Sequence, residues 1–430
     1  MFKKSLAILL ALALVLAFSA CANTQEPTTP ESADEAASSV KIGVLLPFTG
    51  GSAATGEEQF AGIQMAIDKV NAAGGIQSLG GAKIEIVKAD TQSSADVGVT
   101  EIERLITQEK VDVLIGPYNS AVGGSTAPIA EKYKVPYLLS NCTDDNILKN
   151  GYEYVFRANG SNSTNAITIV NFLNSLKENG YEIPKTYGVV YENGDWGTGM
   201  AEQLKTYIPE QLGGEIVLDE PYDSKSADLT PIVNKVKSAD PDILIPMSYL
   251  NDSILLAQGL AQYKVDVPVF ACGGGFSVSD FAEKAGNAGN YILTLSGWNA
   301  GILKYKPEGA AALNDEYKAI WSKDMDEYSA NGYLAGAMMC DALERAGSVD
   351  KEAVRETFAS TDIDADSDVL ILHPYTGIHF ADVRGMHNQN EAATMVTLQI
   401  LNGGYNLVGP LEMVGADSPL VWPVPAWSER

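Results

Sequence analysis

From residue 40 onward, short runs of β-branched and other apolar residues alternate with segments whose apolar residues recur at helical spacing. The first apolar run, residues 41–46, precedes a predicted helix whose end is marked by Gly74 and Gly75. The apolar face of that helix is formed by Phe60, Ile63, Ile67 and Val70. Strands that alternate with helices in this way are typical of parallel α/β layers.

The alternation occurs in two series. The first predicts strands at residues 41–46, 83–88, 111–116 and 136–139. The second predicts strands at residues 187–191, 215–218, 242–246 and 268–271, with helices at 199–207, 229–237 and 253–261. The same module thus appears twice, and we expect two Rossmann-like lobes, each with a parallel central sheet.

After residue 293 the order of elements changes. Helices are predicted first, at residues 310–322, 332–346 and 351–358, and strands follow at 378–380, 394–401 and 405–408. A chain that returns to lobes already built crosses between them several times, which predicts a multi-strand hinge. We expect an N-terminal lobe of residues 40–160 plus 297–385, and a C-terminal lobe of residues 161–296 plus 386–430.

The N-terminus predicts export. Lys3 and Lys4 precede an apolar run that is too short to span a bilayer comfortably, and small residues lead to Cys21, so residues 1–20 are interpreted as a signal peptide. We expect diacylation of Cys21, although Phe18 stands where lipoprotein signals usually carry Leu; the alternative is a plain signal peptide with an incidental cysteine. Residues 21–39 lack large apolar side chains and are predicted to be a lipidated, flexible tether. The predicted location is extracytoplasmic, anchored to the cell membrane.

Charge and cysteine content narrow the possible functions. The chain carries 29 basic and 55 acidic residues, a formal charge of −26, which makes nucleic acid a poor partner. Beyond Cys21 the cysteines are Cys142, Cys272 and Cys340, an odd number without metal-ligand spacing. We therefore expect neither a disulfide framework nor a metal site.

The loops that follow the predicted strands supply the candidate binding residues, because open α/β sheets bind ligands at the carboxyl ends of their strands. Ser120 begins a predicted helix, and it and Thr143 can offer hydroxyls and free amides to an anion, although simple helix capping is the alternative. From the facing lobe, Trp196 and Tyr249 can cover a ligand, or else pack on the surface. The full set of candidates is Phe48, Tyr118, Asn119, Ser120, Asn141, Cys142, Thr143, Trp196, Tyr249 and Asp252.

Enzyme signatures are missing from the places where they would have to be. The glycines between Gly50 and Gly56 depart from the spacing of a dinucleotide fingerprint, so no cofactor is expected. No candidate nucleophile has a base at a recognisable spacing, which leaves an exported hydrolase as a remote alternative.

Taken in order, these loops resemble the leucine/isoleucine/valine-binding protein family of type I periplasmic receptors. The markers of the resemblance are residues 41–47 with Gly50, 60–62, 71–76, 115–117, 195–199 and the closing 422–430, and together they cover about residues 40–430. The resemblance implies that Ser120 and Thr143 hold a ligand carboxylate, that the Asn141 carbonyl accepts from an ammonium, and that Trp196 and Tyr249 close over the ligand.

One departure concerns the ligand's ammonium group. The acidic partner that the family uses for this group falls at Gly274, which has no side chain. A buried ammonium without a partner is costly. Either the ligand lacks an ammonium, or another carboxylate replaces the missing one, with Asp252 and Asp144 as the first candidates.

The function that these observations predict is a monomeric, lipid-anchored solute receptor of an ABC importer. We expect it to capture an amino acid or a related small carboxylate or amide by hinge closure, and to present the closed form to the permease subunits. A ligand-sensing lobe of a signalling system is the main alternative. The sequence leaves open the identity of the ligand and the choice between transport and sensing.

Overall fold

The computed structural model describes residues 39–415, 418–427 and 429, which belong to one compact unit, Ser38–Arg430. The predicted signal peptide, Cys21 and all but the last residue of the predicted tether lie outside the described residues. Among the helices of the described part, none combines the length and the apolar character that a membrane span needs.

The first lobe is built on an eight-stranded sheet in the order β11-β12-β13-β5-β4-β3-β1-β2. The six strands from β13 to β2 run parallel, whereas β12 and β11 are antiparallel additions at one edge. The strands are β1 (Val40–Leu46), β2 (Ile84–Asp90), β3 (Val113–Ile115), β4 (Tyr137–Leu139), β5 (Val155–Arg157), β11 (Asp362–Asp364), β12 (Gly377–Val383) and β13 (Met386–Asn390). The β1, β3, β4 and β5 strands are almost entirely buried, as expected for parallel strands that are covered on both faces.

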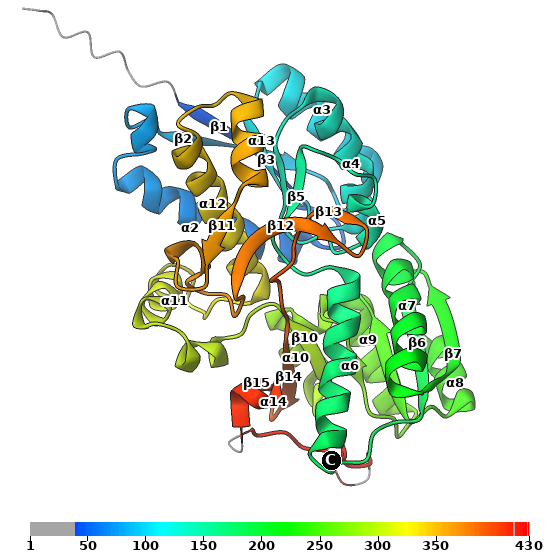
Figure 1. The fold of residues 1–430 in the computed structure, drawn as a ribbon. Helices are drawn as coiled ribbons and strands as arrows, with labels where there is room; N and C mark the ends of the chain where they lie inside the picture. Colours follow the sequence, from blue (N-terminus) through cyan, green and yellow to red (C-terminus); the bar gives the residue numbers. More distant parts are fainter. Residues whose placement is uncertain (1–38, 416–417, 428, 430) are drawn as a thin grey trace, which may run out of the picture. The chain divides into compact units, whose positions relative to one another are not determined.

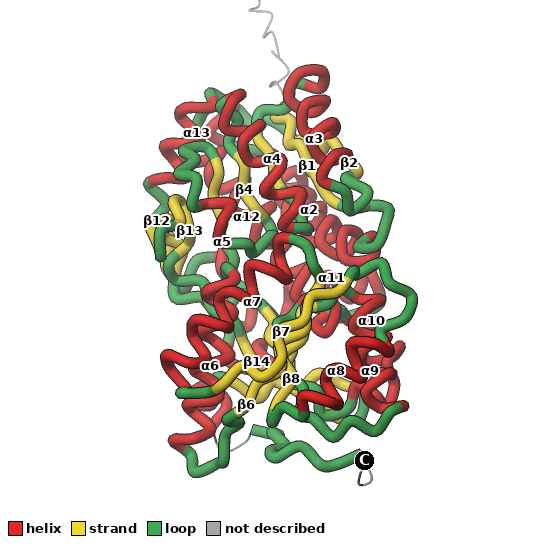
Figure 2. The backbone as a smooth tube through the Cα atoms, turned by 90° about the vertical axis from the view of Figure 1, so that its right-hand side faces the viewer, coloured by secondary structure: helices red, strands yellow, loops and turns green. Residues whose placement is uncertain are grey.

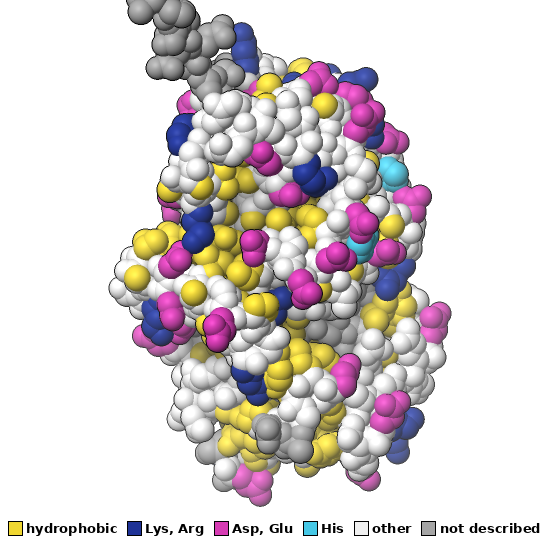
Figure 3. Space-filling model, turned by 60° about the vertical axis from the view of Figure 1, so that its left-hand side comes forward, with side chains coloured by type: hydrophobic (Ala, Val, Ile, Leu, Met, Phe, Trp, Pro, Cys, Tyr) yellow, Lys and Arg dark blue, Asp and Glu magenta, His cyan; other side chains and the backbone are white. Residues whose placement is uncertain are grey.

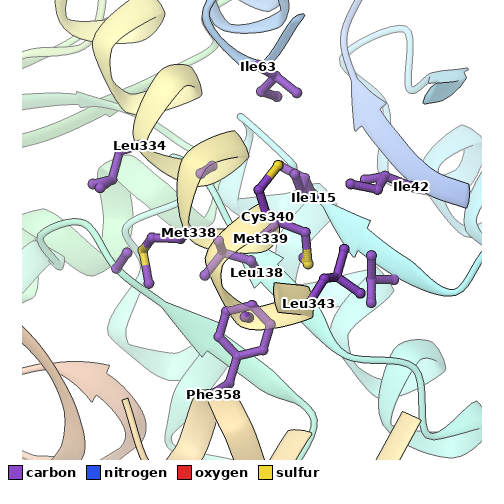
Figure 4. Close-up of a cluster of buried hydrophobic side chains, with 14 of the residues drawn as sticks. Ile42, Ile63, Ile115, Leu138, Leu334, Met338, Met339, Cys340, Leu343 and Phe358 are labelled. Carbon is purple, nitrogen blue, oxygen red and sulfur yellow. The ribbon is translucent and has the colours of Figure 1, made fainter. Parts of the chain in front are cut away.

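Helices cover both faces of this sheet (Figure 1). One face packs against α2 (Ala53–Ala72), α12 (Glu327–Ala346) and α13 (Lys351–Ala359), and the other against α3 (Ala95–Arg104), α4 (Ser120–Tyr133) and α5 (Asp145–Leu148). Figure 4 shows the first of these layers, in which Ile42 and Ile115 of the strands meet Ile63 of α2, Leu343 of α12 and Phe358 of α13.

The α2 and α12 helices touch backbone to backbone. A Cβ atom added to Gly62 would lie 1.9 Å from the Ser329 carbonyl oxygen, and one added to Gly332 would lie 2.0 Å from the Gln59 carbonyl oxygen. Only glycine permits this approach. The contact fixes the first turns of α12, which extend toward the second lobe.

The second lobe contains two short sheets, ordered β7-β6-β8 and β15-β14-β10-β9. A parallel bridge between Leu244 and Val269 joins them into one surface. The strands are β6 (Thr186–Glu192), β7 (Glu215–Tyr222), β8 (Ile243–Met247), β9 (Phe270–Ala271), β10 (Leu293–Ser296), β14 (Val396–Leu401) and β15 (Gly404–Gly409). The strands β6 to β8 are parallel to one another, and β14 and β15 add antiparallel pairs.

The helices of the second lobe also form two layers, which lie on either side of the strands in Figure 2. One layer contains α6 (Asn162–Glu178) and α7 (Asp195–Tyr207), and the other α8 (Thr230–Ala239), α9 (Leu250–Gln262) and α10 (Ser279–Ala285). The α11 helix (Glu308–Trp321) packs in a separate cluster with residues of α2 and β14, and the short α14 (Leu411–Val414) follows β15.

The chain passes between the two lobes three times, after β5, after β10 and after β13. The predicted multi-strand hinge corresponds to these three connections. The last of them was expected at residue 386, but β13 pairs with β5 and β12, so Met386–Asn390 belong to the first sheet and the return comes after Asn390. The β13 strand was not predicted because its residues are polar. Their side chains form hydrogen bonds inside the lobe; for example, Gln389 Oε1 accepts from Arg157 Nε at 2.6 Å.

All three cysteines of the described residues are free and buried. The Cys142 and Cys340 side chains belong to the two apolar layers of the first lobe, and Cys272 belongs to a core of the second. The described part of the fold is therefore held by packing and hydrogen bonds.

Candidate functional site

A cavity lies between the two lobes. Residues of both sheets' strand-end loops and of α12 line it. They are Tyr118, Ser120, Asn141, Thr143, Asn159, Gly160, Asn165, Trp196, Tyr249, Cys272, Gly273, Gly274, Glu327, Tyr328, Asn331, Tyr375 and Met395. Six of the ten predicted binding residues are among them: Tyr118, Ser120, Asn141, Thr143, Trp196 and Tyr249.

The first lobe contributes the start of α4 and the loop after β4. Ser120 is the first residue of α4, and the Asn119 side chain makes no capping hydrogen bond there, so the first amides of the helix keep no side-chain acceptor. The Ser120 hydroxyl oxygen accepts hydrogen bonds from the backbone N–H groups of Thr143 at 3.2 Å and Asp144 at 3.3 Å. Its own proton remains available for the cavity. This wall therefore offers hydrogen-bond donors and the positive end of a helix dipole to an anionic group.

Thr143 lies beside Ser120, but its hydroxyl is engaged. It donates to Asn162 Oδ1 at 2.8 Å, and the Asn162 amide nitrogen in turn donates to the Trp196 carbonyl at 3.3 Å. Asn162 thus connects the loop after β4 to the first turn of α7. A ligand that accepts from the Thr143 hydroxyl would have to replace Asn162 as its acceptor.

The second lobe places Trp196 through the geometry at the start of α7. The Glu192 carboxylate accepts from the amides of Gly194 at 2.7 Å and Gly197 at 2.8 Å, which holds the loop after β6 against the first turn of α7. Trp196 is only 7% exposed, and its ring centroid lies 5.3 Å from that of Tyr249. The two rings form an apolar cover over the cavity.

Aromatic contacts cross from one lobe to the other. Tyr118 of the first lobe lies 6.0 Å from Tyr249 of the second and 5.5 Å from Tyr328 of α12, measured between ring centroids. Burial raises the pKa of all three tyrosines, so each keeps its phenolic proton at neutral pH. The lobes are therefore closed on each other around the cavity.

The first turns of α12 contribute the only acidic side chain among the lining residues that the structure describes. Glu327 is 6% exposed, and its Oε2 atom accepts from Ser277 Oγ at 2.7 Å and Ser296 Oγ at 3.4 Å. Burial raises the pKa of Glu327 to about 7. One turn later, Asn331 donates through Nδ2 to Asn141 Oδ1 at 2.6 Å, which ties α12 to the loop after β4.

Phe48 and Asn119 were predicted in the site, but neither is among the residues that line the cavity. The Phe48 ring packs against Phe60 at 5.5 Å, with the Lys88 ammonium 4.1 Å from its centroid. Asn119 donates to Ser52 Oγ at 3.2 Å within the first lobe. The Asn119 side chain also forms a hydrogen bond with the Tyr249 hydroxyl, so it supports a lining residue from outside the cavity wall.

Cys142 and Asp252 are likewise absent from the cavity wall. The Cys142 side chain is fully buried in the layer beneath α4, because successive residues of an extended segment point to opposite sides. Asp252 is 1% exposed and accepts from the Tyr222 hydroxyl at 2.7 Å inside the second lobe. Asp144, the other suggested carboxylate, accepts from the Asn146 amide at the start of α5.

Several lining residues were not predicted. Asn159, Gly160 and Asn165 flank the start of α6, and Tyr375 and Met395 come from the last third of the chain. For Asn159, Gly160 and Asn165, the polar run after β5 was an available signal. The remaining residues carry no local signal, because only the packing of distant segments brings them to the cavity.

The surface around the lobes mixes charges of both signs, as the face drawn in Figure 3 shows. Within residues 39–415, 418–427 and 429, no group of His, Cys, Asp or Glu side chains is arranged to hold a metal ion.

Comparisons with known proteins agree with this architecture. The model of a family described as "Periplasmic binding protein" matches residues 39–398. The "Leu/Ile/Val-binding protein homolog 7" of Brucella abortus (strain 2308) is 28% identical over 398 residues, covering 90% of this chain and 94% of the relative. The corresponding homolog 8 of Brucella suis biovar 1 (strain 1330) is 28% identical over 382 residues, covering 86% and 90%.

Solved structures show the same fold. A leucine-binding protein from Thermotoga maritima is 25% identical with a TM-score of 0.73, covering 86% of this chain and 98% of that one. A branched-chain amino acid transporter substrate-binding protein from Streptococcus pneumoniae, solved with isoleucine, is 25% identical with a TM-score of 0.73, covering 86% and 100%. A solute-binding protein from R. palustris, solved with benzoate, shares the fold at 19% identity and a TM-score of 0.69, covering 86% and 96%. The chain belongs to the periplasmic binding protein family, with the type I fold of its Leu/Ile/Val-binding relatives, and is a substrate-binding protein rather than an enzyme.

Proposed function

We propose that this protein is the lipid-anchored solute receptor of an ABC importer, and that it captures an amino acid or a related small carboxylate or amide in the cavity between its lobes. The observation that carries the proposal is the convergence of Ser120 and Thr143 from one lobe with Trp196 and Tyr249 from the other on one cavity. The relatives solved with isoleucine and with benzoate support a carboxylate-bearing ligand.

Binding proceeds by closure of the hinge. The ligand first docks on the first lobe, where the Ser120 hydroxyl and the start of α4 receive its carboxylate. Trp196 and Tyr249 then add contacts that exist only when the lobes are closed. Only contacts of this second kind shift the balance between the open and closed forms. The permease binds the closed form.

A panel of ligands tests the proposal. Amino acids, amides, aliphatic carboxylates and benzoate are each added in large excess to the purified protein, and the midpoint of thermal unfolding is measured. A ligand present at about 100 times its Kd raises the free energy of unfolding by about 2.7 kcal/mol. We expect at least one compound of these classes to stabilise the protein and to give a saturable calorimetric titration. An absence of stabilisation across the whole panel would contradict the proposal.

The membrane anchor is tested separately, in cells that express the full chain. Cys21 is the acceptor proposed for the lipid, so Cys21→Ala should abolish incorporation of labelled palmitate and release the protein from the membrane fraction. Cys340→Ala serves as the matched control, because Cys340 is buried in the folded unit. Unchanged labelling of Cys21→Ala would refute lipidation at this residue. Transport is then tested by ligand uptake in cells that lack the gene.

A further inference from the structure

Glu327 is a buried carboxylate that faces a cavity without a counter-charge. It is 6% exposed and lines the cavity from the first turn of α12. Its hydrogen-bond partners are the hydroxyls of Ser277 and Ser296 and the backbone N–H of Gly297, and all three are neutral. Across the described part of the chain, no Lys, Arg or His forms an ion pair with it, and none of the described lining residues is basic. A buried carboxylate is normally paired with a cation, so a charge of opposite sign is missing here.

A second acceptor stands beside it. Asn331 lies four residues further along α12, on the same helix face. Its Nδ2 atom is used by Asn141, whereas its Oδ1 atom is buried and has no hydrogen-bond partner in the protein. A Cβ atom added to Gly297 would lie 3.4 Å from Glu327 Oε1 and 3.3 Å from Asn331 Oδ1, so both oxygens border the same small volume.

Further lining residues carry buried polar atoms without a partner. The Oδ1 atoms of Asn159 and Asn165 and the hydroxyl of Tyr375 are buried without a partner, and all three residues line the cavity. The unpartnered amide oxygens of the lining residues are acceptors, whereas Ser120 and the start of α4 present donors. An ammonium group carries three N–H donors and a positive charge, which matches a carboxylate and an amide oxygen.

We infer that Glu327, together with Asn331, forms the receiving site for an ammonium group, so that a bound ligand must carry a protonated amine in addition to its carboxylate. The inference rests on the proposed function and deepens it, because it excludes simple carboxylates such as benzoate as the preferred ligands. Position 274 cannot carry a replacement carboxylate, since the Trp196 ring occupies the space next to its Cα atom. Asp252 and Asp144 lie outside the cavity wall.

The test uses matched pairs of probes on the wild-type protein. Leucine is compared with 4-methylpentanoate, and phenylalanine with 3-phenylpropanoate, within a panel that contains all twenty amino acids and benzoate. Each pair differs only in the amine. We expect the stabilising compounds to be amino acids, with at least about 100-fold weaker binding of the amine-free partner. Equal affinity for an amine-free acid would overturn the inference while leaving the proposed function intact. A panel in which nothing binds overturns the proposed function and this inference with it.

Two variants then assign the role to a residue. Glu327→Gln keeps the shape and the hydroxyl contacts of the side chain but removes its charge, and we expect about 100-fold weaker binding of the preferred amino acid at pH 8. Asp252→Asn removes a second buried carboxylate that does not line the cavity, and should retain the preference for the amino compound over its amine-free partner. Retention of that preference in Glu327→Gln, or its loss in Asp252→Asn, assigns the ammonium to another carboxylate. If Glu327→Gln fails to fold, the wild-type comparison of matched pairs still decides whether an amine is required.

Discussion

The indole of Trp196 fills the space that any side chain at position 274 would occupy. A Cβ atom on Gly274 would lie 2.3 Å from the ring carbon Cη2 of Trp196 and 3.1 Å from Cζ2. Gly274 also has a φ of +61°, in the left-handed region that favours glycine. The bulky ring at 196 and the bare backbone at 274 therefore depend on each other, and the ring can cover the cavity only while position 274 stays glycine.

Gly274→Ala should displace the Trp196 ring and weaken ligand binding by about 10-fold or more, the loss of about 1.4 kcal/mol of binding free energy. Gly213→Ala is the matched control, because Gly213 has a similar φ of +66° in the left-handed region and open space around its Cα atom. Both variants should lose about 1 kcal/mol of stability from backbone strain. Isothermal calorimetry measures the ligand affinity of each variant, and only Gly274→Ala should bind more weakly. Equal affinities in the two variants would show that the clash with Trp196 has no effect on binding.

Trp196→Ala tests the cover directly. The indole contacts the ligand only when the lobes are closed, so its removal should lower affinity by at least about 10-fold, about 1.4 kcal/mol, without unfolding the protein. Trp321→Ala removes an indole that stacks on Tyr317 outside the cavity, and its ligand affinity should match that of the wild type. Unchanged affinity of Trp196→Ala in calorimetry would remove this residue from the site.

Ser120→Ala should reduce both stability and affinity. The substitution leaves the buried amides of Thr143 and Asp144 without their acceptor, which costs about 1–3 kcal/mol, and it removes a donor to the ligand carboxylate. Ser125 lies on the same helix, where its hydroxyl donates to the Ala121 carbonyl, and Ser125→Ala should change stability by no more than about 0.5 kcal/mol. Denaturant unfolding and calorimetry measure the two effects. Ser120→Ala with wild-type affinity would restrict this residue to a structural role.

Several buried carboxylates make stability depend on pH, among them Glu327, Asp252 and Asp144. Burial raises the pKa of Glu327 and Asp252 to about 7 and that of Asp144 to about 6, each above its value in the unfolded chain. Between the unfolded and folded pKa values the folded protein binds more protons than the unfolded protein does. The free energy of unfolding should therefore fall as the pH of the ligand-free protein rises from about 5 to about 8.

Glu327→Gln should make this pH dependence shallower, because it removes one of the raised groups. The groups that interact electrostatically with Glu327 are its neighbour Asp326, whose pKa is also raised by burial, and four tyrosines whose raised pKa values keep them neutral throughout this range: Tyr118, Tyr328, Tyr375 and Tyr405. Urea unfolding of the wild type and the variant at a series of pH values gives the two slopes. Identical slopes would mean that Glu327 does not change its protonation on unfolding between about pH 5 and about pH 8.

Cys272 reports on opening of the cleft. It lines the cavity and is 2% exposed, and burial raises the pKa of its thiol, so it should react with thiol reagents only when the lobes separate. A ligand that holds the lobes closed should slow this reaction by at least about 10-fold at concentrations well above its Kd. The ligand-sensitive phase should be missing from Cys272→Ser. If saturating ligand leaves the reaction rate of the Cys272 thiol unchanged, the result would contradict hinge closure.

The α/β alternation and the repeated module were predictable because helix and strand periodicities are local properties of the sequence. The predicted strand at residues 41–46 corresponds to β1, and the predicted helix at residues 253–261 lies within α9. The rule that ligands meet strand ends then led to Ser120, Thr143, Trp196 and Tyr249, all of which line the cavity. Short or polar strands such as β5 and β13 escaped prediction, because a few residues carry too little periodicity.

Glu327 was missed because the predicted helix began too late in the chain. The helix was predicted to begin at residue 332, whereas α12 begins at Glu327, with Asp326 capping it through hydrogen bonds from the amides of Tyr328 and Ser329. The missing turns carry Glu327, Tyr328 and Asn331, so the acidic side of the cavity was absent from the predicted site. Asp252 was proposed instead, from its place after a strand, but its side chain accepts from the Tyr222 hydroxyl inside the second lobe.

By itself, the sequence determined the two α/β modules and the loops that can meet at a cleft, since each of these follows from neighbouring residues along the chain. Only the tertiary structure decided which side chains face that cleft. The backbone contact of Gly62 and Gly332 with the facing helices sets α12 beside the cavity, and a one-residue step turns Cys142 inward between Asn141 and Thr143. Side-chain direction depends on packing between segments that lie far apart in the chain, and no local pattern records it.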